Sequence, residues 1–171
     1  MIWFEHISET YFRVQEYFNN IRIVKCAVIN LAAAKKCEIH YNIEALTVEE
    51  ILIDKEIEII LNLTIPRAHY HISKLALESG KHSYAEKPMA IKFEHGKELF
   101  EISKNKKLYI GNAPATFLGG GIQKRRELIA TGVIGDIKLV NAIFAYPGIQ
   151  SYHPHPAPWF IENEGGDVID M

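Results

Sequence analysis

The sequence predicts an α/β protein built on a doubly wound parallel β-sheet, and two observations lead to this prediction. Segments with the three- and four-residue spacing of amphipathic helices recur along the chain, and short β-branched apolar segments typical of buried strands lie between them. Strands that alternate with helices form βαβ units, which make the strands parallel and cover both faces of the sheet. A chain of 171 residues accommodates one domain, or one domain and part of a second.

In the first half of the chain, spacing and capping signals define the helices. Apolar residues spaced by four, three and four predict a helix over 7–18, and a similar pattern predicts a short helix over 33–41. Thr47 followed by Glu50 is a capping box that opens another helix. Two nearly continuous β-branched segments predict buried strands at 21–29 and 57–63.

In the second half, proline and glycine delimit the elements. Pro66 opens a helix that ends at Gly80. The later pattern predicts strands over 82–85, 108–110 and 137–146, and helices over 92–105 and about 117–132. Pro114 and three consecutive glycines interrupt the pattern between 112 and 121, so we expect a domain boundary there, with domains over 1–115 and 116–171.

Composition excludes several classes of function. Apolar residues make up 48% of the chain, charged residues 23%, and the net charge is −2, so nothing predicts a nucleic-acid partner or binding to an anionic membrane. No apolar run approaches the ~18 residues that span a bilayer, and no signal peptide is recognisable. Cys26 and Cys37 are interpreted as buried free thiols, and we expect a cytoplasmic protein.

Polar residues follow two of the predicted strands. Thr64-Ile65-Pro66 comes after 57–63, and Glu86-Lys87-Pro88 comes after 82–85, so both segments lie where doubly wound sheets bind ligands. A lysine there can donate to a ligand hydroxyl or transfer a proton, because burial moves its pKa toward neutrality. Pro88 holds Lys87 in extended geometry. Taken alone, however, a lysine after a strand is more often a solvated loop residue.

Four segments together resemble the Gfo/Idh/MocA family of nicotinamide-dependent oxidoreductases. They are LNLTIPRAHYHISKLALESGKH, its continuation into SYAEKPMA, IQKRRELIATGVIGDIKLVNAIF and WFIENEGGDVIDM, which occur in the family's order and cover nearly the whole chain. The resemblance implies a Rossmann-type NAD(P)-binding domain over 1–115, followed by the start of an α+β substrate domain over 116–171. It also implies hydride transfer between a sugar or polyol and NAD or NADP.

The resemblance assigns roles to six residues. Lys87 would be the catalytic lysine, contacting a substrate hydroxyl and the nicotinamide ribose, and Asp170 matches the family's active-site aspartate. Four residues would form the cofactor site: Thr64, Pro66, Glu86 and Pro88. The resemblance implies a homo-oligomer for the intact family, an expectation that we do not extend to this chain.

Two features of the cofactor site depart from the family pattern. The family has a glycine-rich turn after its first strand, which lets a pyrophosphate approach a helix N-terminus. Here Trp3-Phe4-Glu5 occupies about that place, and no glycine occurs before Gly80. Val28 stands where the family usually has an acidic residue for the ribose hydroxyls, and Asn30 offers only a weaker hydrogen bond.

The two ends of the chain also depart from the pattern. The first strand is reduced or missing, and the family's histidine that follows the position of Asp170 would lie beyond Met171. The sequence therefore predicts a copy truncated at both ends, with weak or absent turnover.

Other interpretations remain open at this stage. The chain can be a non-catalytic protein that keeps its binding edge for a sugar phosphate or a partner, or a product that does not fold stably. His153 and His155 can in principle bind a metal together with Asp170. We interpret them instead as part of a loop near the substrate site and predict no metal.

Overall fold

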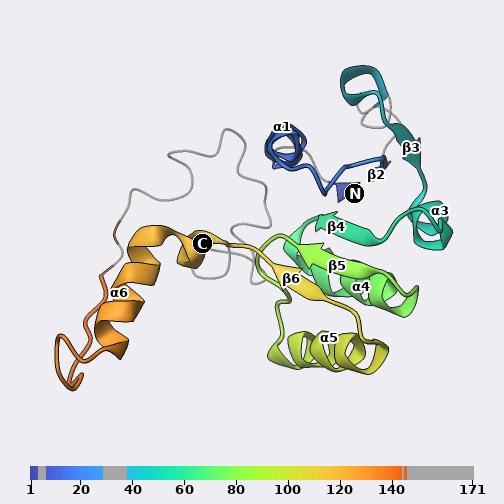
Figure 1. The fold of residues 1–171 in the computed structure, drawn as a ribbon. Helices are drawn as coiled ribbons and strands as arrows, with labels where there is room; N and C mark the ends of the chain where they lie inside the picture. Colours follow the sequence, from blue (N-terminus) through green and yellow to red (C-terminus); the bar gives the residue numbers. More distant parts are fainter. Residues whose placement is uncertain (4–6, 29–37, 144, 146–171) are drawn as a thin grey trace. The chain divides into compact units, whose positions relative to one another are not determined.

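The computed structural model describes residues 1–3, 7–28, 38–143 and 145 (Figure 1). The chain divides into two compact units, Met1–Ala113 and Pro114–Met171. Among the described residues, no helix has the length and apolar character needed to span a bilayer.

The first unit contains a six-stranded parallel sheet with the order β3-β2-β1-β4-β5-β6. Its strands are β1 (Ile2–Trp3), β2 (Lys25–Val28), β3 (Glu44–Leu46), β4 (Ile59–Leu63), β5 (His82–Ala85) and β6 (Ile110–Asn112). The order reverses between β1 and β4, as in doubly wound dinucleotide-binding sheets. The predicted fold class is therefore confirmed.

Strand β1 is only two residues long, yet it lies at the centre of the sheet. Ile2 pairs with Ala27 of β2 on one side and with Asn62 of β4 on the other. The amino terminus extends this pairing, because the Met1 ammonium donates to the Lys25 carbonyl over 2.9 Å and the Met1 carbonyl accepts from Ala27 N–H over 2.8 Å. The predicted reduction of the first strand is confirmed, and the shortened strand still joins both of its neighbours.

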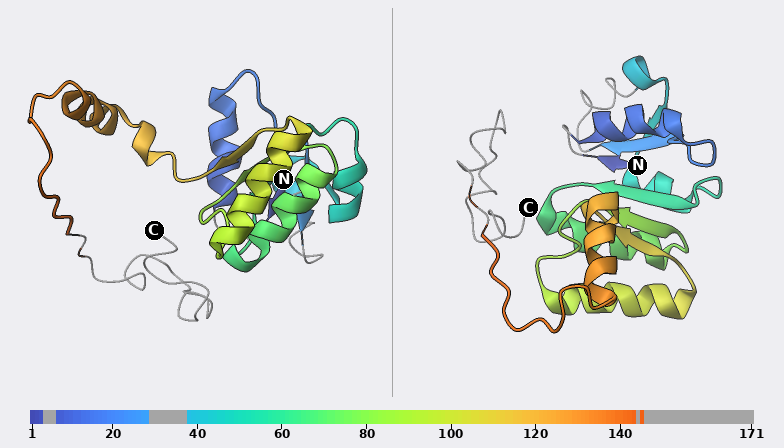
Figure 2. Two further views of the ribbon diagram at one scale, coloured as in Figure 1. Left: turned by 90° about the horizontal axis from the view of Figure 1, so that it is seen from below. Right: turned by 60° about the vertical axis from the view of Figure 1, so that its left-hand side comes forward.

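Alternating residues of the strands form two cores, one on each face of the sheet. Helix α1 (Ser8–Val14), continued by the turn η1 (Gln15–Tyr17), covers one face. The buried residues there are Met1, Phe12, Cys26 and Leu63. Helices α3 (Val48–Ile53) and α4 (Pro66–Glu78) cover the other face, over Ile2, Ala27, Ile51, Ile57, Ile60 and Ala76. Helix α5 (Phe93–Lys106) lies beside α4 (Figure 2).

Capping residues begin and end these helices as the sequence predicts. Glu50 N–H donates to Thr47 Oγ1 over 3.1 Å while Glu50 Oε2 accepts from Thr47 N–H over 2.8 Å, which completes a capping box. Pro66 is the first residue of α4. Gly80 follows the same helix with a φ of +81°, in the left-handed region that glycine adopts without steric cost.

The predicted and observed strands differ at three places. Residues 21–24 are not in a strand, because the Ile23 N–H donates to the side chain of Gln15 instead of to a neighbouring strand. Strand β3 was not predicted, because its three residues are too few for a visible pattern. The strand predicted over 108–110 forms as β6 but begins at Ile110, two residues later than predicted.

The second unit begins with η2 (Thr116–Leu118) and α6 (Gly120–Ala130), with Gly119 as the helix N-cap. The helix predicted over about 117–132 forms as α6. The strand predicted over 137–146 does not form over the described residues 137–143, where Ile143 is 93% exposed. A strand is stable only when another strand pairs with it, and no such partner occurs in the described part of this unit.

Charged groups join the elements at the amino-terminal end of the strands. The Lys25 ammonium lies 2.5 Å from Asp54 Oδ2, and this hydrogen bond lowers the pKa of Asp54. The Lys81 ammonium donates to the backbone carbonyls of Asp54 and Ile57 over 2.5 and 2.7 Å. The end of α3 is therefore bound to the starts of β2 and β5.

We expect Thr47→Ala to lower the free energy of unfolding by about 1 kcal/mol, because the N3 amide of α3 loses its acceptor. Thr47→Ser retains an oxygen at the same position and is the matched control. Urea denaturation measures both variants. Equal losses in the two variants would contradict a capping role for this hydroxyl.

Acid should weaken the Lys25–Asp54 pair. Because the pKa of Asp54 is lowered in the folded protein, its contribution is present above the ordinary aspartate value of about 3.9 and is lost as the pH falls through the lowered value. Urea denaturation at about pH 7 and about pH 3 should show that the free energy of unfolding falls less between these pH values for Asp54→Asn than for the wild type. Glu56→Gln, at an 81% exposed side chain 3.8 Å from Lys25, should retain the wild-type loss.

Candidate functional site

The carboxyl ends of β4, β5 and β6 meet at one edge of the sheet. Asn62 pairs with Ala85, and Ala85 pairs with Asn112. The ladder continues past the strands, because Glu86 N–H donates to the Asn62 carbonyl over 3.0 Å and Ala113 N–H donates to the Ala85 carbonyl over 2.9 Å. The segments that follow β4 and β5 are therefore neighbours, as the sequence predicts.

Glu86 is held by a tyrosine from the first helix. The Tyr11 hydroxyl of α1 donates to Glu86 Oε1 over 2.8 Å, and Glu86 Oε2 accepts from Lys87 N–H over 3.2 Å. Both carboxylate oxygens are engaged, so the side chain is fixed beneath its own turn. This contact also connects α1 to the end of β5 across 75 residues of sequence.

The two tyrosines near Glu86 have raised pKa values. Burial is the main cause for Tyr11, and the hydrogen bond to Glu86 adds to the increase. Burial is again the first cause for Tyr84, followed by the negative charge of Glu86. Both phenols are thus neutral at physiological pH, and the Tyr11 hydroxyl is the one that donates to the carboxylate.

Lys87 and Pro88 complete the turn after β5. Both residues are partly buried, and the peptide bond between them is cis. The Pro88 carbonyl is 2.6 Å from Nδ1 of His69 on α4. The turn is therefore held from α1 through Glu86 and from α4 through Pro88.

A buried polar cluster holds the end of β4. Asn62 has no exposed surface; its Nδ2 donates to the His69 carbonyl and to Ser73 Oγ, each over 3.0 Å. The Asn62 Oδ1 accepts from the Thr64 hydroxyl over 2.7 Å. The Thr64 carbonyl in turn lies 2.7 Å from Nε2 of His69. These contacts join β4, the segment after it and α4, so the cluster fixes the position of residue 64 at the edge.

The residues predicted to form the site are distributed as follows. Thr64, Glu86, Lys87 and Pro88 lie together at the edge, and Pro66 is buried at the start of α4. Asp170, His153 and His155 lie outside the described residues. In the described ranges, no three histidine, cysteine or acidic side chains are grouped for a metal.

Sequence reasoning missed the roles of Tyr11 and His69. Tyr11 was interpreted only as part of an apolar helix face, although a tyrosine on such a face needs a partner for its hydroxyl. The structure buries His69, at 1% exposure, beneath the turn. Along α4, His69 and Ser73 are fully buried, while Ala68 and Leu75 are only partly buried.

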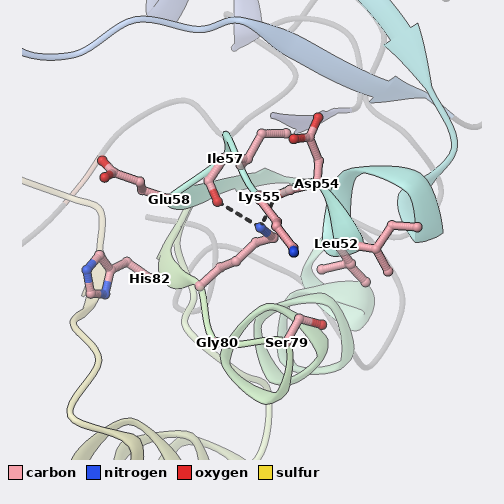
Figure 3. Close-up of a pocket in the computed structure, with 10 residues that line it drawn as sticks. Leu52, Asp54, Lys55, Ile57, Glu58, Ser79, Gly80 and His82 are labelled. Carbon is pink, nitrogen blue, oxygen red and sulfur yellow. Dashed lines mark hydrogen bonds between the residues drawn. The ribbon is translucent and has the colours of Figure 1, made fainter.

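A hollow of about 740 Å³ lies at the opposite end of the strands (Figure 3). Its lining includes Asp54, Ile57, Glu58, Lys81 and His82, which precede or begin β4 and β5. The Lys81 ammonium already donates to two carbonyls there, and burial lowers its pKa. Ligands of doubly wound sheets bind at the carboxyl ends of the strands, so we do not assign the hollow to the chemistry of Lys87.

The β1–α1 connection and the carboxyl edge of the sheet differ in how well their residues suit a dinucleotide. Strand β1 ends at Trp3 and α1 begins at Ser8, so Phe4-Glu5-His6-Ile7 connects them without a glycine. Bulky side chains and a carboxylate are poorly suited to the close approach of a pyrophosphate. At the edge itself, the buried Asn112 Oδ1 has no hydrogen-bond partner within the described structure. An amide N–H of a ligand is the kind of donor that would satisfy it.

Comparisons with known proteins agree with this geometry. A sequence profile of the Gfo/Idh/MocA group, described as "Oxidoreductase family, NAD-binding Rossmann fold", matches residues 6–112. An uncharacterised oxidoreductase of Schizosaccharomyces pombe is 31% identical over 129 residues, which cover 72% of this chain and 35% of that protein. The D-xylose 1-dehydrogenase (NADP(+)) of Hypocrea jecorina is 34% identical over 88 residues, covering 52% of this chain and 22% of that protein.

The fold has counterparts among solved structures. The biliverdin reductase of Synechocystis, in complex with biliverdin and NADP+, aligns with a TM-score of 0.66 and 22% identity over 77% of this chain and 42% of that one. Identity at this level shows a shared fold. The chain spans about a third or less of the length of the two curated relatives described above.

We expect Tyr11→Phe to lower the free energy of unfolding by about 1–2 kcal/mol, because Glu86 loses a hydrogen bond in a partly buried site. Tyr17→Phe removes a hydroxyl from an 82% exposed side chain just beyond α1 and should change nothing. Urea denaturation near neutral pH compares the two. If both variants match the wild type, the Tyr11–Glu86 contact does not stabilise the fold.

Proposed function

Because the chain belongs to the Gfo/Idh/MocA oxidoreductase family with its NAD-binding Rossmann fold, we propose that it is the cofactor-binding part of an NAD- or NADP-dependent dehydrogenase. The substrate that we propose is a sugar or related polyol. The supporting observation is the Glu86-Lys87-Pro88 turn, which hydrogen bonds from α1 and α4 hold at the carboxyl edge of the sheet.

The proposed reaction gives each partner one task. Oxidation of an alcohol carbon releases a hydride and a hydroxyl proton. The nicotinamide, when bound, accepts the hydride. Lys87 accepts the hydroxyl proton on its neutral amine and becomes an ammonium, and its restricted turn limits the positions that this nitrogen can reach. Asp170 assists at the substrate, and Thr64, Pro66, Glu86 and Pro88 form the wall of the cofactor site.

Sugar chemistry is supported by one relative. The matching protein from Hypocrea jecorina is named as a D-xylose 1-dehydrogenase that uses NADP(+). We propose that this chain takes the same class of small polyhydroxylated substrate. We also propose that the segment that begins near residue 116 is the start of a substrate domain.

The alternative is a non-catalytic protein that keeps the edge for a sugar phosphate or a partner. The observation that favours it is the connection Phe4-Glu5-His6-Ile7, in which no glycine is available for a pyrophosphate. Under this alternative Lys87 serves binding alone. Cofactor binding and hydride transfer therefore have to be measured separately.

The first test is a fluorescence titration of the purified chain with NADH and with NADPH. We expect saturable binding that is weaker than micromolar, because the β1–α1 connection lacks glycine. Micromolar or tighter binding would contradict the expected weakening at the pyrophosphate. Absence of saturable binding for both nucleotides would contradict the proposed dehydrogenase function.

The second measurement follows reduction of NAD and NADP with a panel of sugars and polyols. Lys87→Met should lower the rate by about 100-fold or more, in the range of a lost general acid–base group, while NADH affinity stays within a few-fold. Lys92→Met is the matched control, because Lys92 is an exposed lysine after the same turn. Cofactor binding with no transfer to any substrate would favour the non-catalytic alternative.

A further inference from the structure

His69 occupies an unusual position between two backbone carbonyls. Its Nε2 is 2.7 Å from the Thr64 carbonyl oxygen, and its Nδ1 is 2.6 Å from the Pro88 carbonyl oxygen. The first carbonyl belongs to the segment after β4, and the second belongs to the turn after β5. One ring therefore spans the two segments that carry the proposed site.

The chemistry of the two contacts determines the protonation of the ring. A backbone carbonyl oxygen only accepts hydrogen bonds. A neutral imidazole has one N–H donor, and its other nitrogen has a lone pair, which would face a carbonyl oxygen at repulsive range. Only the imidazolium form donates both bonds, and charged donors also form the short bonds seen here.

The surroundings keep the ring in this position. The side chain is 1% exposed, so water does not replace either carbonyl. The backbone of the same residue is fixed independently, because Asn62 Nδ2 donates to the His69 carbonyl over 3.0 Å. The histidine is thus anchored to β4 through its backbone while its ring reaches the turn.

We propose that His69 is a positioning residue whose imidazolium ring holds the Lys87–Pro88 turn against the end of β4. These two hydrogen bonds would set the position of Lys87 over the cofactor, a consequence that rests on the proposed function. When the ring loses a proton, one of the two bonds is lost. The turn is then released from β4 or from α4, and cofactor affinity falls as the pH rises.

Other ionisable groups occur on the segments that meet at this ring. They are Arg67, Tyr70, His71, Lys74 and Glu78 on α4, and Glu86, Lys87 and Lys92 on the turn; β4 and residues 64–65 contribute none. Glu86 already accepts from Tyr11 and from Lys87 N–H. His71, the other histidine on α4, is exposed.

The direct test is independent of any cofactor. Long-range ¹H–¹⁵N NMR of the histidine-labelled chain distinguishes a protonated ring nitrogen from a bare one, and the His69→Gln spectrum assigns the signals. At about pH 6, in the lower part of the range where histidines ordinarily titrate, we expect both nitrogens of His69 to carry protons. One bare nitrogen at that pH would overturn the proposal.

The functional consequence is tested by NADH titration at about pH 6 and about pH 8.5, on either side of the ordinary histidine range. Wild type should bind several-fold more weakly at the higher pH. His69→Gln has both of its donors on a single nitrogen and cannot span the two carbonyls as the ring does, so it should bind weakly at both. His71→Gln, two residues along the same helix, should keep the wild-type profile. An unchanged profile in His69→Gln would overturn the positioning role.

The two hypotheses can fail separately. If wild type binds neither NADH nor NADPH at either pH, the proposed function fails, and the NMR result alone decides whether the ring is doubly protonated. If wild type binds NADH but the NMR spectrum contains a bare ring nitrogen at about pH 6, only the inference about His69 fails.

Discussion

The parallel pairing of β1 with both of its neighbours is the constraint on which the rest of the structure depends. Two residues, Ile2 and Trp3, connect the β2–β3 half of the sheet to the β4–β5–β6 half. Backbone groups at the centre of a sheet are buried and have to be paired. The Met1 contacts to Lys25 and Ala27 lengthen this junction, so that a very short strand still provides a continuous sheet.

Once the sheet is continuous, its two ends have different tasks. At the amino-terminal end, Lys25 pairs with the Asp54 carboxylate and Lys81 donates to the Asp54 carbonyl at the end of α3. The charged groups there stabilise the fold. At the carboxyl end, Glu86 and His69 hold a turn that carries Lys87. The two lysines near β5 lie at opposite ends of the strand: Lys81 precedes it and donates to two carbonyls, and Lys87 lies in the turn that follows it.

The proposed chemistry and the proposed cofactor affinity therefore depend on different parts of the chain. The turn after β5 is held by two independent helices, whereas the connection from β1 to α1 has no glycine to admit a pyrophosphate. Nicotinamide chemistry requires the first part, and tight dinucleotide binding requires the second. The weakly binding enzyme and the non-catalytic alternative would both keep the turn after β5, and they differ in whether a nucleotide binds there and reacts.

The sequence by itself determined the α/β class, most of the helices, the capping box at Thr47 and the location of Thr64 and Glu86–Pro88 after their strands. These features depend on local periodicity and on residues close in sequence. Only the tertiary structure decided that Tyr11 holds Glu86 and that His69 joins Thr64 to Pro88. Tyr11 and Glu86 are 75 residues apart and His69 and Pro88 are 19 apart, so no local pattern records these contacts. His69 and Thr64 are close in sequence, but only the burial of the ring brings them together.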